Sequence, residues 1–210
     1  MPAKKEWQEA LVSRHGAELQ KKFFSSAIAV CGLGGLGSNI AVSLARAGIG
    51  KLILIDFDRV DITNIHRQQY SINQIGSYKT EALEENLLKI APYIEIRSVT
   101  KKITEDNCAE LLKDADIVIE AFDDAESKAM IVDRVLKLFP KCYIISSSGM
   151  AGIDTPNTIK TRKVTNRFYL CGDEVSDAEN SVGLVAPRVM LCAAHQALTA
   201  LRILAEKYDV

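Results

Sequence analysis

Three glycines near the start of the sequence have a spacing suited to phosphate binding. Gly32, Gly34 and Gly37 form the pattern G-x-G-x-x-G directly after an apolar run, 27–31, and Gly35 lies within the same turn. Where such a turn follows a strand and opens a helix, backbone N–H groups and the helix dipole face a phosphate. The alternative is that the glycines only let strand and helix pack closely. The strand and helix context favours a nucleotide-binding turn.

An acidic residue follows at the distance typical of a ribose-binding carboxylate. Asp56 ends the second apolar run, 24 residues after Gly32. In dinucleotide-binding folds a carboxylate meets the ribose hydroxyls at an offset of about 20 residues. At this point NAD and ATP are equally compatible with the pattern.

The polar segment behind Asp56 favours ATP. It contains many polar side chains, and Lys79 follows at the start of a helical pattern; the set is Asp58, Asp61, Asn64, His66, Arg67, Gln68 and Gln69. Hydride transfer does not need such a set. Displacement at the α-phosphate of ATP needs cations that neutralise the attacked phosphoryl group and the leaving pyrophosphate. We therefore predict Arg67 and Lys79 as catalytic cations, against the alternative that each is a solvated surface residue.

Two adjacent carboxylates follow a later apolar run. Asp123 and Asp124 come just after 117–119, at the carboxyl edge of the sheet, where open α/β proteins bind ligands. Paired carboxylates at that edge are suitable ligands for magnesium bound against phosphates. The alternative is that they cap the helix expected at 126–138.

Apolar runs and helical patterns alternate along the chain. The runs predict strands at 27–31, 52–55, 95–99, 117–119 and 143–145, and the helical patterns predict helices at 6–24, with Gly16 as a candidate break, and at 36–47, 79–90, 104–113, 126–138 and 187–207. Near-continuous apolar strands between helices indicate a parallel sheet covered on both faces. We predict an α/β fold, Rossmann-like and doubly wound, with an antiparallel extension at 158–164 and 168–170.

The length and composition indicate one soluble domain. A chain of 210 residues forms one sizeable core, so we expect a single domain over 1–210. Within it we expect an N-terminal helical segment at 1–25, a region of strands with a mobile loop at 149–186, and a final helix at 187–207. The mobile loop itself is expected at 172–183. The net charge of −1 gives no field that attracts nucleic acid or an anionic membrane. No apolar run approaches a membrane span, and the N-terminus lacks a signal-peptide core. We expect a cytoplasmic protein without nucleic-acid or membrane partners.

Taken together, the motifs resemble the ubiquitin-activating-enzyme superfamily, specifically its ThiF/MoeB/HesA branch. The resemblance rests on the turn 32–37, Asp56 with Asp58, the run 64–68, Lys79, and Asp123 with Asp124. The resemblance covers about 26–154 closely and the final helix more loosely. The compact length is similar to that of short ThiF-type sulfur carrier protein adenylyltransferases.

This resemblance implies a reaction and a set of contacts. ATP and Mg²⁺ would adenylate the C-terminal Gly-Gly carboxylate of a ubiquitin-like, ThiS-like sulfur carrier, in thiamine biosynthesis, and the enzyme would be a homodimer. Gly35 would approach the nucleotide, Asp56 the ribose, and Asp123 the magnesium. Asn64, Arg67 and Lys79 would contact the phosphates. The full expected ATP-binding set is Gly32, Gly34, Gly35, Gly37, Asp56, Asp58, Asn64, Arg67, Gln68, Lys79, Asp123 and Asp124.

The sequence departs from the family pattern at two places. Relatives usually carry paired CxxC zinc motifs, whereas the cysteines here, Cys31, Cys108, Cys142, Cys171 and Cys192, are scattered, so we expect reduced thiols and no zinc. Cys171 is a candidate thiol for capturing the activated carrier, which requires a partly exposed thiolate. Relatives also send an N-terminal arginine into the neighbouring subunit, a role for which only Arg14 is available. The rival functions are an NAD-dependent oxidoreductase and a non-catalytic nucleotide-binding sensor of the same fold.

Overall fold

The computed structural model describes residues 1–177 and 182–210, and its central feature is a sheet. In this described part the sheet has seven strands in the order β3-β2-β1-β4-β5-β7-β6. Neighbouring strands are parallel except for β6 and β7, which are antiparallel. The strands are β1 Ala27–Cys31, β2 Lys51–Ile55, β3 Glu95–Val99, β4 Ile117–Glu120, β5 Tyr143–Ser147, β6 Lys160–Lys163 and β7 Phe168–Gly172.

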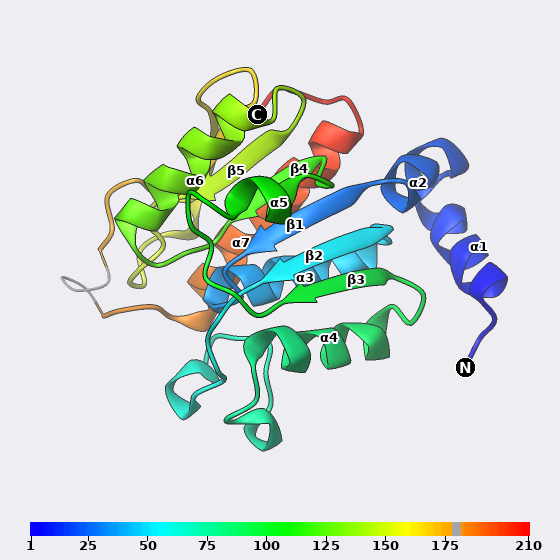
Figure 1. Ribbon diagram of the computed structural model, residues 1–210, viewed down its shortest axis with the longest axis horizontal. Coiled ribbons are helices and arrows are strands. Elements are labelled where there is room, and N and C mark those ends of the chain that lie inside the picture. Colours follow the sequence, from blue (N-terminus) through cyan, green and yellow to red (C-terminus); the bar gives the residue numbers. More distant parts are fainter. Residues whose placement is uncertain (178–181) are drawn as a thin grey trace.

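Helices cover both faces of the sheet, as Figure 1 shows. The helices of the described part are α1 Lys4–His15, α2 Ala17–Phe24, α3 Gly35–Ala47, α4 Lys79–Ile90, α5 Cys108–Leu112, α6 Ala125–Leu138 and α7 Ala186–Leu204. Helices α3, α4 and α7 share one buried apolar cluster with the sheet, and α5 and α6 share another. The predicted doubly wound, mostly parallel α/β fold is confirmed.

The central strand β1 shows why the sheet is buried on both faces. Ile28 and Val30 pack into the cluster beneath α3 and α7, whereas Ala29 and Cys31 pack into the cluster beneath α6. Successive side chains of a strand point to opposite faces, so an uninterrupted apolar run serves both cores. This is the pattern that predicted the parallel sheet.

Most of the predicted elements are present, with two differences. The helix expected from 104 begins only at Cys108, because Thr104 does not cap it: the Thr104 backbone N–H donates to Asn107 Oδ1 at 2.9 Å and forms a turn instead. The run at 168–170 joins the parallel sheet beside β5, so only β6 is antiparallel.

The loop predicted as mobile falls partly on 178–181, outside the described residues. Gly16, with φ +84°, separates α1 from α2 as expected.

No helix in the described part of the chain has the length and apolar character needed to cross a bilayer.

The turn between β1 and α3 packs so tightly that two of its glycines have no room for a side chain. A Cβ at Gly37 would lie 1.8 Å from the carbonyl oxygen of Gly32. Gly32 itself has φ +88°, and a Cβ there would lie 2.7 Å from the carbonyl oxygen of Ala121, beyond β4. The packing interpretation of the motif therefore holds for Gly37 and contributes at Gly32.

We predict that Gly37→Ala destabilises the protein by about 3 kcal/mol or more, at the upper end of overpacking penalties, because the neighbouring atom is backbone and cannot rotate away. Gly34→Ala, where a Cβ would be 3.8 Å from the nearest atom, is the matched control and should cost less than about 1 kcal/mol. Urea unfolding of both variants measures the two values. Equal losses would contradict the packing role assigned to Gly37.

Candidate functional site

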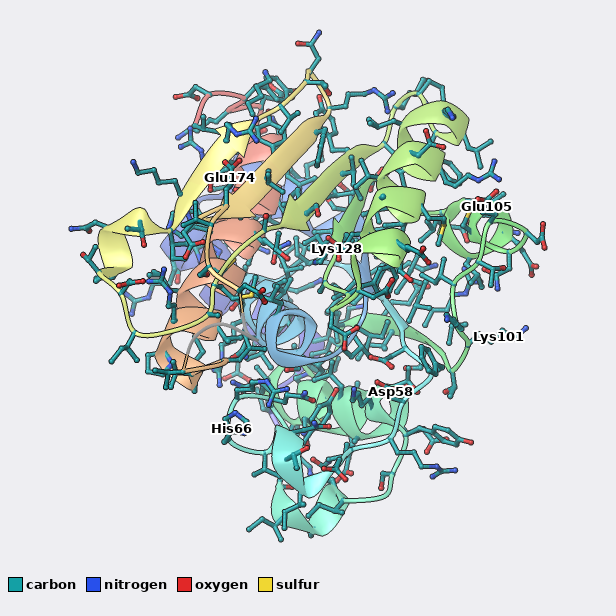
Figure 2. The ribbon with its side chains drawn as sticks, turned by 90° about the vertical axis from the view of Figure 1, so that its left-hand side faces the viewer. Asp58, His66, Lys101, Glu105, Lys128 and Glu174 are labelled. Carbon is teal, nitrogen blue, oxygen red and sulfur yellow. The ribbon has the colours of Figure 1, made fainter. Side chains whose placement is uncertain are left out.

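A cavity of about 880 Å³ opens at the carboxyl ends of the parallel strands. Figure 2 looks onto this end of the sheet, with α3 seen end-on near the centre. The strand order reverses between β1 and β4, and open α/β sheets bind ligands at such a switch point. Of the predicted ligand-binding residues, the following line the cavity: Gly32, Gly34, Gly35, Asp56, Asp58, Asn64, Arg67, Gln68, Lys79, Asp123 and Asp124.

The amino end of α3 forms the floor of this cavity. Gly34, Gly35 and Leu36 line it, and no side chain caps the helix. The first N–H groups of an α-helix have no partner within the helix, and the helix dipole makes this end partly positive. The turn is therefore suited to hold an anionic group such as a phosphate.

Asp56 joins the ends of β1 and β2. Its side chain is 8% exposed. One carboxylate oxygen accepts the Leu33 N–H at 2.6 Å, and the other accepts the Asp58 N–H at 2.8 Å. These bonds fix the glycine turn relative to β2 and hold the carboxylate at the cavity wall, with further lone pairs for a ligand.

The segment after Asp56 is fastened to the beginning of α3. The Tyr70 hydroxyl donates to the Leu33 carbonyl at 2.7 Å. The Gln69 backbone donates to the Ser38 hydroxyl, and the Asn39 side chain donates to the carbonyl of Arg67. These bonds bring residues far from the glycines in sequence against the turn.

Two polar atoms of this segment are buried without a hydrogen-bond partner in the described part of the chain, Nε of Arg67 and Oε1 of Gln68. Buried polar atoms are normally paired. The Arg67 side chain lies against Gly35, and that of Gln68 lies beside Gly34. A ligand with both acceptor and donor atoms at the turn would satisfy them, which a nucleotide provides.

Other residues of the segment already have partners. Asn64 Oδ1 accepts the Asp61 N–H at 3.2 Å and completes a capping box. Arg67 Nη1 donates to the Thr63 carbonyl at 3.0 Å and lies 3.2 Å from the His66 ring. Asn64 therefore supports the local turn as well as lining the cavity.

Lys79 is a buried cation at the edge of the cavity. Its side chain is 8% exposed, and its Nζ lies 2.8 Å from Oδ2 of Asp58. The alternative of a solvated surface lysine is wrong. An ion pair held at a cavity wall provides a positioned positive charge for an anionic ligand.

The two adjacent carboxylates have separate roles. Asp124 caps α6, since its Oδ1 accepts the Ser127 N–H at 2.7 Å, and hydrogen bonds from Ser127 lower the pKa of this carboxyl. The capping interpretation therefore holds for Asp124. Asp123 is exposed, and within the described residues its side chain has no hydrogen bond or ion pair. Of this pair, Asp123 is therefore the one whose two carboxylate oxygens both lack a partner among the described residues.

Sequence reasoning missed Lys128, which also lines the cavity. Its Nζ donates to Glu120 Oε1 at 2.9 Å and to Ser147 Oγ at 3.2 Å. The sequence offered only one signal, a lysine one helical turn after Asp124. Its partners come from β4 and β5, which only the folded chain brings together. Lys101, Lys102 and Arg59 are further cavity cations that were not singled out.

A buried ion pair supports the wall of the cavity after β7. Arg188, on α7, lies with Nη2 2.5 Å from Oδ2 of Asp173, and both side chains are buried. Arg188 also donates to the Asp154 carbonyl at 3.0 Å. Burial alone would raise the pKa of Asp173, but hydrogen bonds from Ser176 and from Arg188 outweigh it and bring the pKa to about 2.

Three predicted site residues do not lie at the cavity. Gly37 packs beneath the turn. Cys171 is 0% exposed, and burial raises the pKa of its thiol to about 11, so the expected partly exposed thiolate is wrong. Arg14 is exposed on α1, which packs at the amino ends of the strands, opposite the cavity (Figure 1). The five cysteines are buried and unpaired, and the described residues contain no cluster of His, Cys, Asp and Glu that would hold a metal.

The fold and site define a Rossmann-like α/β protein with a glycine turn suited to bind an anionic group. By sequence, residues 8–210 match the ThiF family, and the chain belongs to this family. A molybdopterin-synthase adenylyltransferase from Haemophilus influenzae is 32% identical over 88% of this chain and 76% of its own length. A sulfur carrier protein adenylyltransferase from Thermus thermophilus is 26% identical over 62% of this chain and 49% of its own.

Several relatives are longer than this chain. An adenylyltransferase and sulfurtransferase, MOCS3, from Aedes aegypti is 33% identical over 68% of this chain, and that match spans 32% of the relative. Among solved structures, the E. coli tRNA N6-threonylcarbamoyladenosine dehydratase in complex with ATP has a TM-score of 0.87 at 22% identity, covering 99% of this chain and 98% of the other. This structural likeness bears on the fold alone.

We predict that the contribution of Asp173 to stability is lost in acid. Its folded pKa of about 2 lies below the value of about 3.9 for an unfolded aspartate. The stabilisation is therefore complete above about pH 4 and lost as the pH falls towards 2. Asp173→Asn leaves Arg188 buried without its counter-charge and should destabilise the protein at pH 7.

Urea unfolding of the two proteins between pH 5 and pH 2 checks this. The difference in free energy of unfolding between the original protein and Asp173→Asn should narrow as the pH falls through this range. A constant difference would show that the pKa of Asp173 is not lowered in the folded protein.

Proposed function

We propose that this protein uses ATP to adenylate the C-terminal Gly-Gly carboxylate of a ubiquitin-like sulfur carrier protein. The single observation that carries this proposal is the shared cavity, in which the uncapped glycine turn meets two cations, Arg67 and Lys79, and a free carboxylate, Asp123. The names of the relatives from H. influenzae and T. thermophilus, both adenylyltransferases, support the same reaction class, nucleotidyl transfer.

ATP fits the cavity as a substrate. Asp56 would bind the ribose, and the α3 N–H groups with Arg67 and Lys79 would bind the phosphates, with Asn64 and Gln68 beside them. A carboxylate oxygen of the carrier forms a bond to the α-phosphorus while the bond to the leaving pyrophosphate breaks. A carboxylate is ionised and nucleophilic at neutral pH, so no side chain has to remove a proton.

Magnesium also fits the donors present. Asp123 offers unshared carboxylate oxygens at the cavity, and hard oxygen ligands suit Mg²⁺ bound against phosphates. The ion would supply positive charge that neutralises the phosphates.

The rival functions explain fewer of these residues. An NAD-dependent oxidoreductase would use the glycine turn and Asp56 but has no need of Lys79 or Asp123. A non-catalytic nucleotide sensor would keep the binding residues without turnover. Cations directed at phosphates next to a free carboxylate favour nucleotidyl transfer.

We also propose a pathway, an oligomeric state and a cellular location for this protein. We infer a ThiS-like carrier and thus thiamine biosynthesis, which the name of the T. thermophilus relative, a sulfur carrier protein adenylyltransferase, supports; relatives named for molybdopterin synthase mark the competing destination. We also infer a homodimer in which the exposed Arg14 enters the partner's cavity, and a cytoplasmic location where such carriers are found.

ATP–pyrophosphate exchange tests the reaction. We predict exchange with ATP, Mg²⁺ and a purified carrier ending in Gly-Gly, and none without the carrier or with a carrier whose C-terminus is amidated. A ThiS-like carrier should be preferred over a molybdopterin-type carrier. Tight ATP binding without exchange would favour the sensor, and tight NAD binding would refute the proposal.

Substitution of the three candidate catalytic residues separates chemistry from binding. Arg67→Ala, Lys79→Ala and Asp123→Ala should each lower the exchange rate about 100- to 1,000-fold, the loss found for one preorganised electrostatic group. ATP affinity should fall less. Lys137→Ala, an exposed lysine on α6, serves as the control and should retain full activity. A variant with unchanged rate would remove that residue from the proposed machinery.

A further inference from the structure

A cluster of a buried acid, a lysine and two serines lies beside the cavity, at the carboxyl ends of β4 and β5. Glu120, the last residue of β4, has a side chain that is 0% exposed. It accepts hydrogen bonds from the Phe122 N–H at 2.6 Å, from Lys128 at 2.9 Å and from the Ser146 hydroxyl. A buried carboxylate costs several kcal/mol unless it is paired in this way.

Lys128 connects the buried acid to the cavity. Lys128 and Ser147 line the cavity, whereas Glu120 does not. The ammonium has three N–H groups, of which one donates to Glu120 and one to Ser147. Because Ser147 accepts from Lys128, its own O–H is free to donate. The wall therefore offers two donors, one N–H and one O–H, to a ligand.

These donors lie on the opposite side of the glycine turn from the nucleotide-binding candidates that follow β2. Asp56, Asp58 and Lys79 belong to the β2 side of the turn, and Lys128 and Ser147 to the β4–β5 side. Figure 2 shows Asp58 and Lys128 on either side of the end of α3. If the ribose lies at Asp56 and the phosphates at the turn, the β4–β5 side remains for the attacking group.

We propose that Lys128 and Ser147 bind the carboxylate that is adenylated, and that Glu120 is a positioning residue that holds Lys128 in place. This inference rests on the proposed function. Two donors match the two oxygens of a carboxylate. One oxygen forms a bond to the α-phosphorus. At the same time the bond between the α-phosphorus and the oxygen that bridges to the β-phosphorus breaks, and pyrophosphate leaves with the electron pair of that bond. No proton is transferred in the step.

The alternative is that Lys128 only neutralises Glu120. The two roles differ in which ligand is affected when Lys128 is removed. A binding role predicts weaker binding of the carboxylate substrate at constant ATP affinity. A purely neutralising role predicts lower stability with both ligands bound as before.

The test uses Lys128→Met, with Lys137→Met on the same helix as the matched control. We measure KM for a purified Gly-Gly carrier in the exchange reaction and Kd for ATP without carrier. We predict that Lys128→Met raises the KM for the carrier about tenfold to a hundredfold, the effect of losing a hydrogen bond to a charged group, and changes the Kd for ATP less than twofold. Lys137→Met should change neither. An unchanged KM, or an equal loss of ATP affinity, would overturn the proposal.

Two further measurements keep the test decisive. Ser147→Ala leaves the Glu120–Lys128 pair intact, so it should fold even if Lys128→Met does not, and it should still raise the KM for the carrier. Binding of glycyl-sulfamoyladenosine, a stable acyl-adenylate mimic, requires no turnover: the original protein should bind it more tightly than AMP, and Ser147→Ala should lose that preference. An original protein that catalyses no exchange with the carrier refutes the proposed function. Exchange with an unchanged KM in the variants refutes only the role of Lys128 and Ser147.

Discussion

The site depends on a place where the backbone at the ends of β1 and β4 and at the start of α3 approaches too closely for any side chain. At the turn between β1 and α3, Gly37 lies against the carbonyl of Gly32, and Gly32 lies against Ala121 beyond β4. Because of this contact, the amino end of α3 points across the ends of the parallel strands. The Asp56 carboxylate then fixes the turn from the β2 side through the Leu33 N–H. The remaining site residues are arranged around this point.

Two lysines at the cavity, Lys79 and Lys128, are held in place by ion pairs. Lys79 is fixed by Asp58 and Lys128 by Glu120, and Asp173 with Arg188 supports the outer wall. Paired charges in a partly buried site keep their geometry at little reorganisation cost, which is what stabilisation of a transferred phosphoryl group requires. Asp123 lacks such a partner among the described residues, which agrees with its proposed role as a ligand for magnesium bound with ATP.

The glycines of the G-x-G-x-x-G motif have two different physical roles, lining the cavity and close packing. Gly34 and Gly35 line the cavity, whereas Gly37 is required for packing. In the same way, Asp124 caps α6 and leaves Asp123 at the cavity. Cys171, which lies in β7, is buried by α7 and β6, so its position in sequence before an acidic segment did not indicate exposure.

Apolar runs and helical periods are local properties, so the order and type of the elements could be predicted from the sequence alone. The glycine turn, Asp56, Lys79 and Asp123 could be identified as candidates because each lies next to a strand end or a helix start, and Arg67 because it lies in the polar segment behind Asp56. The Glu120–Lys128–Ser147 cluster and the Asp173–Arg188 pair could not be predicted from the sequence alone. These contacts join residues from different strands and helices. Only the lateral order of the strands, fixed by burial of both faces of the sheet, decides which strand ends become neighbours.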